Sequence, residues 1–224
     1  MKRMEMLEGL FHSPGFWLAL FPLGFVIGLL AACEDAVPGP EVAVEEEAAA
    51  AAPMREERIE TDIPDVELVD QHGRTHRFYS DLIQGKLVLM NAIYTSCAGT
   101  CPMQTSIFSS VQKHLGDRVG QDVQMISVSL DPLNDKPSRL KMFAEKYGAK
   151  PGWIFLTGDK EDVRIALEAM DLYAPNPEDH TPICALGNDD TGVWMKLINL
   201  SSPDEIVSRL HYVAQLDPAS FRRD

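Results

Sequence analysis

Basic residues are scarce in this chain of 224 residues: 20 Lys and Arg stand against 34 Asp and Glu, leaving a formal net charge of −14. This deficit argues against a nucleic acid as partner, because phosphate backbones are bound mainly through Lys and Arg. Internal repeats are absent, which excludes a repeat array, and cysteine occurs only four times. The length suits one domain of ordinary size with appendages.

One long apolar stretch occurs near the N-terminus, over residues 15–32, and it follows Lys2 and Arg3. It ends in Leu-Ala-Ala directly before Cys33, which resembles a bacterial lipobox with Cys33 as the acylated first residue of the mature protein. Two early glutamates and the length of the stretch leave an uncleaved N-terminal membrane anchor as the alternative. Both readings predict an exported, membrane-anchored protein that faces the periplasm or another extracytoplasmic side.

The segment that follows is acidic and of low complexity. Residues 34–60 hold nine acidic and two basic residues, three prolines and few large apolar groups. Such a composition is typical of a solvated tether rather than a packed element. We therefore predict a signal peptide over 1–32, a flexible linker over 33–60 and one domain over 61–224.

Strands and helices are expected to alternate along this domain. Helices are predicted over 102–115, 138–147, 159–170 and 202–214, and strands over 66–69, 75–79, 86–94, 123–130, 153–156, 182–186 and 193–198. The last two strands read as a hairpin. This order predicts an α/β thioredoxin-like fold, in which helices flank a central mixed sheet and a β-hairpin and helix close the chain.

Cys97 and Cys101 stand between the strand at 86–94 and Pro102, which suits the start of a helix. A helix N-terminus favours thiolate over thiol, so the second sulfur is expected to ionise readily. Three intervening residues, including Gly99, let both sulfurs bind one soft metal ion. In an oxidising compartment the pair would also tend to form a disulfide. The alternative is a structural disulfide or two unrelated cysteines.

His180 precedes the strand at 182–186, which is expected to lie beside the strand that carries the cysteines. Thr181–Pro182 is a candidate cis peptide bond, and that geometry would bring the imidazole over Cys97 and Cys101. Two thiolates and one imidazole suit Cu(I) and can hold Cu(II), whereas zinc usually takes a fourth ligand. A solvated loop histidine is the alternative.

Other potential ligands fit structural roles better. Three methionines at strand or helix spacing are predicted to lie in the core: Met90, Met103 and Met125. Four histidines on a turn or on helices are predicted to be solvated: His72, His76, His114 and His211. The remaining cysteine, Cys184, lies on a predicted strand and is expected to be a small buried hydrophobe rather than a resolving thiol.

Over residues 61–216 the chain resembles the Sco/SenC family of copper-binding, membrane-tethered thioredoxin-fold proteins. The resemblance rests on four segments in order: YTSCAGTCP, SVSLDPLND, WIFLTG and EDHTP. It implies copper ligation by Cys97, Cys101 and His180, and a supporting role near the site for Asp131. Two features depart from the family pattern: the loop Ala-Gly-Thr between the cysteines, and the proline after Thr181.

The resemblance implies a metallochaperone that takes copper from an upstream donor and delivers it to a respiratory enzyme, such as the dinuclear copper site of cytochrome c oxidase. A thiol–disulfide reductase is the alternative. In it, Cys97 and Cys101 act as a redox pair that prepares the target's cysteines and is itself served by an upstream thiol reductant. A peroxide-reducing or redox-sensing relative is a third class, which no feature specifically supports. Whether the protein is an enzyme stays open at this stage.

Overall fold

The computed structural model describes residues 55–59, 62–199 and 201–216. The chain divides into two units, 1–47 and 48–224, and every described residue lies in the second. The predicted signal peptide, Cys33 and most of the predicted linker lie outside the described residues. Among the helices that are described, none combines the length and apolar character that a membrane span requires.

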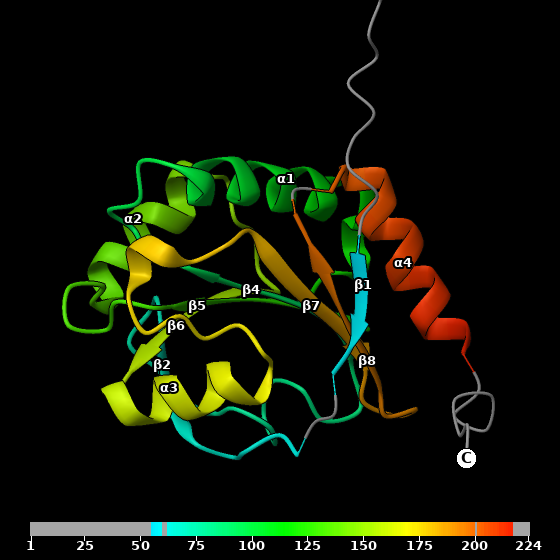
Figure 1. Cartoon of the computed structure of the whole chain (residues 1–224), viewed down its shortest axis with the longest axis horizontal. Coiled ribbons are helices and arrows are strands. Elements are labelled where there is room, and N and C mark those ends of the chain that lie inside the picture. Colours follow the sequence, from blue (N-terminus) through cyan, green and yellow to red (C-terminus); the bar gives the residue numbers. More distant parts are fainter. Residues whose placement is uncertain (1–54, 60–61, 200, 217–224) are drawn as a thin grey trace, which may run out of the picture. The chain divides into compact units, whose positions relative to one another are not determined.

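One sheet of eight strands forms the centre of the described unit, in the order β1-β8-β7-β4-β5-β6-β2-β3 (Figure 1). The pairs β4–β5 and β5–β6 are parallel, and the other neighbours are antiparallel. The strands are β1 Arg55–Arg58, β2 Glu67–Asp70, β3 Thr75–Arg77, β4 Leu87–Ile93, β5 Val123–Ser129, β6 Trp153–Gly158, β7 Ile183–Asn188 and β8 Val193–Ile198.

Helices cover both faces of this sheet (Figure 1). The first core cluster contains residues of α1, α2 and α4, and the second, on the opposite face, contains residues of α3 and of the segment 78–83. The helices are α1 Thr100–Leu115, α2 Pro137–Lys146, α3 Lys160–Ala169 and α4 Pro203–Gln215, with short 3-10 turns η1 Gly116–Arg118 and η2 Pro177–Asp179. This confirms the predicted α/β fold class, including the final hairpin and helix.

The central strands are buried on both faces, which explains their nearly continuous apolar sequences. All seven residues of β4 and all seven of β5 are buried. Successive side chains point to opposite faces of a sheet, so Leu89 joins the first core cluster and Met90 the second. The parallel centre places the carboxyl ends of β4 and β5 at one edge, where loops can position a site.

Three expectations were wrong in detail. Residues 55–58, assigned to the flexible linker, form β1, which pairs with β8 at the edge of the sheet. Met103 is 56% exposed, because it lies on the outer side of the first turn of α1, whereas Met90 and Met125 are buried as predicted. His76 is half-buried, because its Nε2 contacts the buried Asp70 carboxylate at 3.0 Å.

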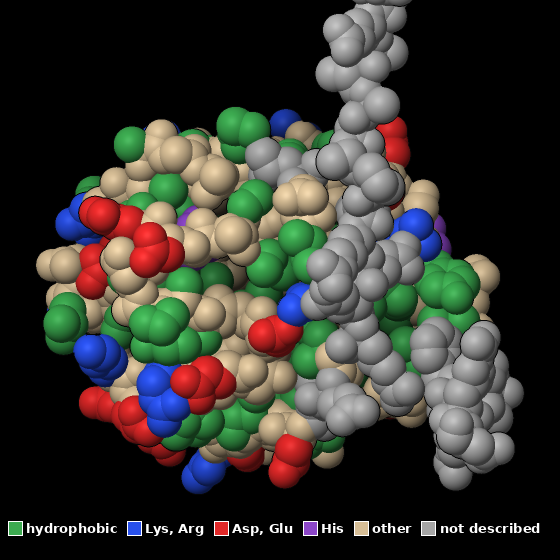
Figure 2. All heavy atoms as spheres, in the orientation of Figure 1, with side chains coloured by type: hydrophobic (Ala, Val, Ile, Leu, Met, Phe, Trp, Pro, Cys, Tyr) green, Lys and Arg blue, Asp and Glu red, His purple; other side chains and the backbone are tan. Residues whose placement is uncertain are grey.

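The predictions for the other three histidines and for Cys184 agree with the structure. His72, His114 and His211 are exposed, and Cys184 is only 3% exposed. Burial raises the pKa of the Cys184 thiol to about 12, so this sulfur is an inert core group. On the face drawn in Figure 2, acidic side chains stand beside basic ones rather than gathering in one patch of a single sign.

Candidate metal centre

The loop that carries the two cysteines begins where β4 ends. The Cys97 amide donates to the Tyr94 carbonyl at 3.2 Å, and this turn redirects the chain toward α1. Gly99 is the N-cap of α1, so Cys101 lies in the first helical turn. Pro102 follows as the third helical residue, where its missing N–H would have had no partner within the helix.

Cys101 and His180 lie together although they are 79 residues apart in the chain. The Cys101 sulfur is fully buried, and it lies 3.7 Å from His180 Nε2. His180 follows the η2 turn, whose N-cap Asn176 accepts a hydrogen bond from the Glu178 amide. The imidazole packs edge-on against the Tyr94 ring, with 5.9 Å between the ring centroids. A thiol and an imidazole are thus held within reach of one soft ion.

The two thiols differ in their tendency to ionise, and in the opposite sense from the prediction. Burial raises the pKa of Cys101 to about 12. Burial alone would also raise the pKa of Cys97, but hydrogen bonds from the Cys101 amide and the Tyr94 hydroxyl lower it below its usual value. The helix N-terminus therefore favours the thiolate of the preceding cysteine rather than of the buried one. Cys97 is the accessible, reactive sulfur of the pair.

The neighbouring ionisable groups stay neutral. Desolvation lowers the pKa of His180, so the imidazole keeps a free lone pair near neutral pH. The hydrogen bond to Cys97 raises the pKa of Tyr94 to about 12, so its hydroxyl remains a donor to that sulfur. The site therefore offers a neutral imidazole and, in Cys97, a thiol whose lowered pKa makes it easier to ionise than an ordinary thiol. Neutral imidazole and thiolate are the forms that bind a metal.

A buried chain of hydrogen bonds fixes α1 against the start of β7. Trp153 Nε1 donates to Ser127 Oγ at 3.0 Å, and Ser127 Oγ donates to Asn91 Oδ1 at 2.7 Å. Asn91 Nδ2 donates to Gln104 Oε1 at 3.0 Å, and Gln104 Nε2 donates to the Ile183 carbonyl at 2.9 Å. Because Gln104 is one turn after Cys101 and Ile183 is three residues after His180, these hydrogen bonds hold the segments that carry Cys101 and His180 next to each other.

A buried carboxylate that the sequence analysis did not single out holds the first part of the cysteine loop. Asp135 is 0% exposed, and it accepts hydrogen bonds from the Thr95 amide at 3.0 Å, the Thr95 hydroxyl at 2.5 Å and the Ser129 hydroxyl at 2.6 Å. The half-buried Asp131 instead accepts from Asn134 Nδ2, at 2.8 and 3.0 Å. The supporting role assigned to Asp131 stays a prediction, and Asp135 is the residue that contacts the loop.

The expected cis peptide bond at Thr181–Pro182 is wrong, because no cis bond occurs among the described residues. His180 reaches the Cys101 sulfur through the η2 turn and an extended backbone at its own position, with φ −67° and ψ 135°. The three described cysteines are free. Within the described ranges, no group of three His, Cys, Asp or Glu side chains is arranged to hold a metal ion. Cys101 and His180, two of the three predicted ligands, lie together, and we call this pair the half-site; that it binds a metal stays a prediction.

Fold and site together define a thioredoxin-like α/β protein with a thiol pair and an imidazole at the carboxyl end of a central strand. The sequence model described as SCO1/SenC matches residues 57–215, so the chain belongs to the SCO1/SenC family. It is 37% identical over 99 residues to the SCO1 protein homolog of Bacillus subtilis, which covers 43% of this chain and 51% of the relative. The chain thus spans about half the length of that relative.

Two solved structures share the fold and part of the sequence. BsSco, a member of the Sco family of cytochrome c oxidase assembly proteins, superposes with a TM-score of 0.59 at 28% identity, over 72% of this chain and 98% of that one. ScoI of Bradyrhizobium japonicum, solved with copper bound, gives a TM-score of 0.54 at 26% identity, over 66% of this chain and 96% of that one.

Proposed function

We propose that this protein is a membrane-tethered copper chaperone that binds one copper ion through Cys97, Cys101 and His180 and delivers it to a respiratory copper enzyme. The observation that carries the proposal is the 3.7 Å approach of His180 Nε2 to the buried Cys101 sulfur. A dithiol that only exchanges disulfides needs no imidazole there. Two related proteins support the choice of metal and recipient: a Bradyrhizobium japonicum relative with copper bound, and a family member described as a cytochrome c oxidase assembly protein.

Copper binding would complete the half-site by a small movement. Cys101 and His180 supply a buried sulfur and nitrogen, and the half-buried Cys97 turns its sulfur toward them to add the third ligand. A set of two thiolates and one neutral imidazole matches the soft, low-coordinate preference of Cu(I). Binding releases the Cys101 proton, because only the thiolate ligates the metal.

Delivery would proceed by ligand exchange from the accessible side of the site. Of the two proposed sulfur ligands, only Cys97 is partly exposed and has a lowered pKa. A thiolate of the recipient can therefore displace Cys97 first, while the buried Cys101 still holds the ion. Release of Cys101 and His180 then transfers copper to the recipient's own ligands.

The asymmetry of the two thiols favours a second candidate function, reduction of a disulfide in the recipient. In that reaction the Cys97 thiolate attacks one sulfur of the target disulfide, and the other target sulfur leaves as a thiolate. Cys101 then loses its proton and attacks Cys97. This step forms the Cys97–Cys101 disulfide and releases the second target thiolate. A thiol reductant is needed to restore the pair.

Replacement of His180 separates the two functions. We expect His180→Ala to weaken copper binding by at least about 100-fold, because a direct ligand matters more than the outer groups whose loss costs 10–100-fold. Reduction of a small disulfide substrate should stay nearly unchanged, because exchange needs only the thiols. The measurements are copper affinity, disulfide-exchange rate and restoration of oxidase activity in cells that lack the protein.

His114→Ala is the matched control, since His114 is an exposed histidine near the far end of α1. It should behave as the unaltered chain in all three measurements. If His180→Ala loses copper but still restores oxidase activity, the reductase is the physiological function. If the unaltered chain shows negligible exchange, the chaperone stands alone.

We also propose that Cys33 is acylated and anchors the protein outside the cytoplasmic membrane. The support is the Leu-Ala-Ala-Cys sequence at the end of the apolar stretch. Mass spectrometry of the mature protein should find Cys33 at the N-terminus with attached acyl chains, and Cys33→Ala should leave the precursor unprocessed or release the domain. An intact Met1 on a membrane-bound protein would instead establish the uncleaved anchor.

A further inference from the structure

A row of hydrogen-bonded polar side chains crosses the apolar core next to helix α1. Four side chains form it, each at most 4% exposed: Trp153 in β6, Ser127 in β5, Asn91 in β4 and Gln104 in α1. Burial of a polar group is unfavourable unless its hydrogen bonds are made. Among the described residues, Thr157 Oγ1 is the only buried side-chain nitrogen or oxygen without a partner, so no buried polar atom of this row lacks a bond.

The hydrogen bonds of this row run in one direction only. An indole N–H can only donate and a backbone carbonyl can only accept, and these two groups stand at the ends of the row, in Trp153 and Ile183. The hydroxyl and the two amides between them therefore each have a single orientation that satisfies both neighbours. For Gln104 this orientation places the amide oxygen toward Asn91 and the amide N–H toward Ile183. A reversed amide would break both bonds.

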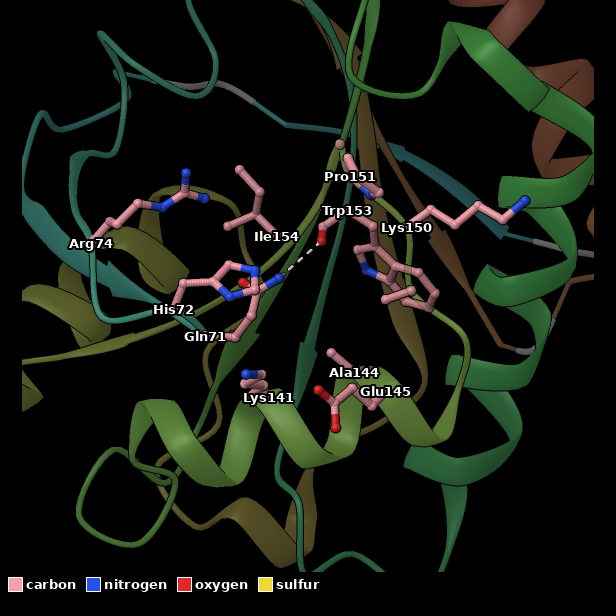
Figure 3. A pocket seen from close by; sticks show the side chains of 12 residues that line it. Gln71, His72, Arg74, Lys141, Ala144, Glu145, Lys150, Pro151, Trp153 and Ile154 are labelled. Atoms are coloured by element: carbon pink, nitrogen blue, oxygen red, sulfur yellow. Dashed lines mark hydrogen bonds between the residues drawn. The ribbon is translucent and has the colours of Figure 1, made fainter.

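The far end of the row is anchored in the core. Gln71 Nε2 donates to the Trp153 carbonyl at 3.3 Å (dashed line in Figure 3), and Gln71 Oε1 accepts from the Phe155 amide at 2.9 Å. The Trp153 ring packs against Phe155 and against Phe108 of α1, with 4.9 and 6.0 Å between the ring centroids. The row therefore starts from a fixed point and can hold its other end in place.

The other end of the row holds the start of the strand that His180 precedes. The last residue of β4 that pairs with β7 is Asn91, and Ile183 lies one residue beyond its partner toward His180. The bond from Gln104 therefore extends the attachment of this strand toward His180. From Ile183 back to His180 the chain is short and stiff, because the Ile183 amide donates to the Thr181 carbonyl at 2.8 Å and the proline at position 182 has a fixed φ.

We propose that Gln104 is a positioning residue of the copper site, which holds the imidazole of His180 at the distance from Cys101 that copper binding needs. This inference rests on the proposed copper function and names a residue outside the ligand set. An apolar side chain at position 104 could fill the same space, so packing alone does not need the amide. The amide adds the bond to Ile183, and its loss frees the start of β7 from α1. Ligands that are not held in place bind a metal more weakly.

Gln104→Leu tests this inference through the affinity for Cu(I), measured on the reduced full chain in detergent against a competing copper chelator. We expect the affinity to fall about tenfold, the lower end of the loss of about 10–100-fold that follows removal of groups that orient metal ligands. Combined with His180→Ala, the same substitution should change the affinity by less than about twofold, because the ligand on which Gln104 acts is already absent. A general loss of structure would lower the affinity in both backgrounds.

Gln112→Leu is the matched control, because Gln112 lies on the same helix and makes the same kinds of bond. It is 3% exposed, its Nε2 donates to the Gly148 carbonyl at 3.2 Å, and its Oε1 accepts from the Lys150 amide at 2.9 Å. Each substitution removes one donated and one accepted bond from a buried amide, so both should lower the free energy of unfolding in urea by similar amounts. The control should keep the copper affinity within about twofold, since its bonds lie outside the site.

A measurement without copper follows the position of the imidazole directly. In nuclear magnetic resonance spectra of the chain with isotope-labelled histidine, the ring signals of His180 are identified by their absence in His180→Ala. These signals should shift in Gln104→Leu and stay in place in Gln112→Leu. Gln104→Met, whose unbranched side chain follows the shape of glutamine more closely, should behave as Gln104→Leu does and replaces it if the leucine variant unfolds.

The outcomes distinguish this inference from the proposed function. An unchanged affinity in Gln104→Leu, an equal loss in Gln112→Leu, or a loss that persists beside His180→Ala would overturn the inference and leave the proposed ligands standing. Unshifted His180 signals in the copper-free Gln104→Leu chain would overturn it as well. An unchanged affinity in His180→Ala alone would overturn the ligand set, and this inference with it.

Discussion

Cys101→Ser is expected to reduce copper binding from one ion per chain to none. Cys101 supplies the buried sulfur 3.7 Å from His180 Nε2, and a hydroxyl cannot replace a thiolate as a ligand for Cu(I). Without that sulfur, the proposed ligand set is reduced to one thiolate, Cys97, and the imidazole of His180. The measurement is an anaerobic copper titration of the reduced full chain, with metal content and the visible spectrum recorded after gel filtration.

Cys184→Ser is the matched control for this experiment. Both residues are buried thiols of the first core cluster, and burial raises the pKa of each to about 12. Each substitution places a hydroxyl in a buried position and lowers the free energy of unfolding by a similar amount. Only the change at position 101 removes a proposed ligand. Retention of one copper by Cys101→Ser, or its loss in Cys184→Ser, would contradict the proposed site.

The sequence predicts the proposed ligands because short motifs, each a few residues long, place them at the ends of recognisable strands and helices. A buried strand, two cysteines three residues apart and a helix start specify one half of the site, and a histidine before the neighbouring strand specifies the other. The pairing of β7 with β4 confirms that these strands are neighbours. The position of His180 before this strand, with a cis bond at Thr181–Pro182, predicts that the imidazole approaches both cysteines. The approach to Cys101 is confirmed, but the cis bond is absent.

The parts that sequence reasoning missed depend on which atoms are buried. The helix N-terminus favours a thiolate, but it does not reveal which cysteine points into the core, and burial of Cys101 outweighs the helix effect. Asp135 is one of many acidic residues in the chain, and only the folded loop shows that Thr95 and Ser129 donate to it. Its place as the last Asp of SVSLDPLND is the signal that could have identified it. Residues 55–58 read as linker because the edge partner β8 is about 140 residues away.

Asp135→Ala is expected to lower the free energy of unfolding by about 3 kcal/mol and to weaken copper binding as well. The substitution leaves the Thr95 amide, the Thr95 hydroxyl and the Ser129 hydroxyl without their buried acceptor. Each buried donor that loses its partner lowers the free energy of unfolding by about 1–3 kcal/mol, so the loss for three donors starts at about 3 kcal/mol. Partial hydration of the donors keeps the total near this lower limit. Urea unfolding of the reduced chain, followed by far-UV circular dichroism, measures the change.

Asp131→Ala separates this effect from a general loss of acidic side chains in the same turn. The Asp131 carboxylate bonds only to the exposed Asn134 among the described hydrogen bonds, so its loss should cost about 1 kcal/mol. Asp135→Asn keeps an acceptor oxygen and should recover part of both stability and copper affinity. Copper affinity is the decisive readout, because release of Thr95 frees the loop that carries Cys97. If Asp135→Ala binds copper as tightly as the unaltered chain, Asp135 stabilises the fold without positioning the site.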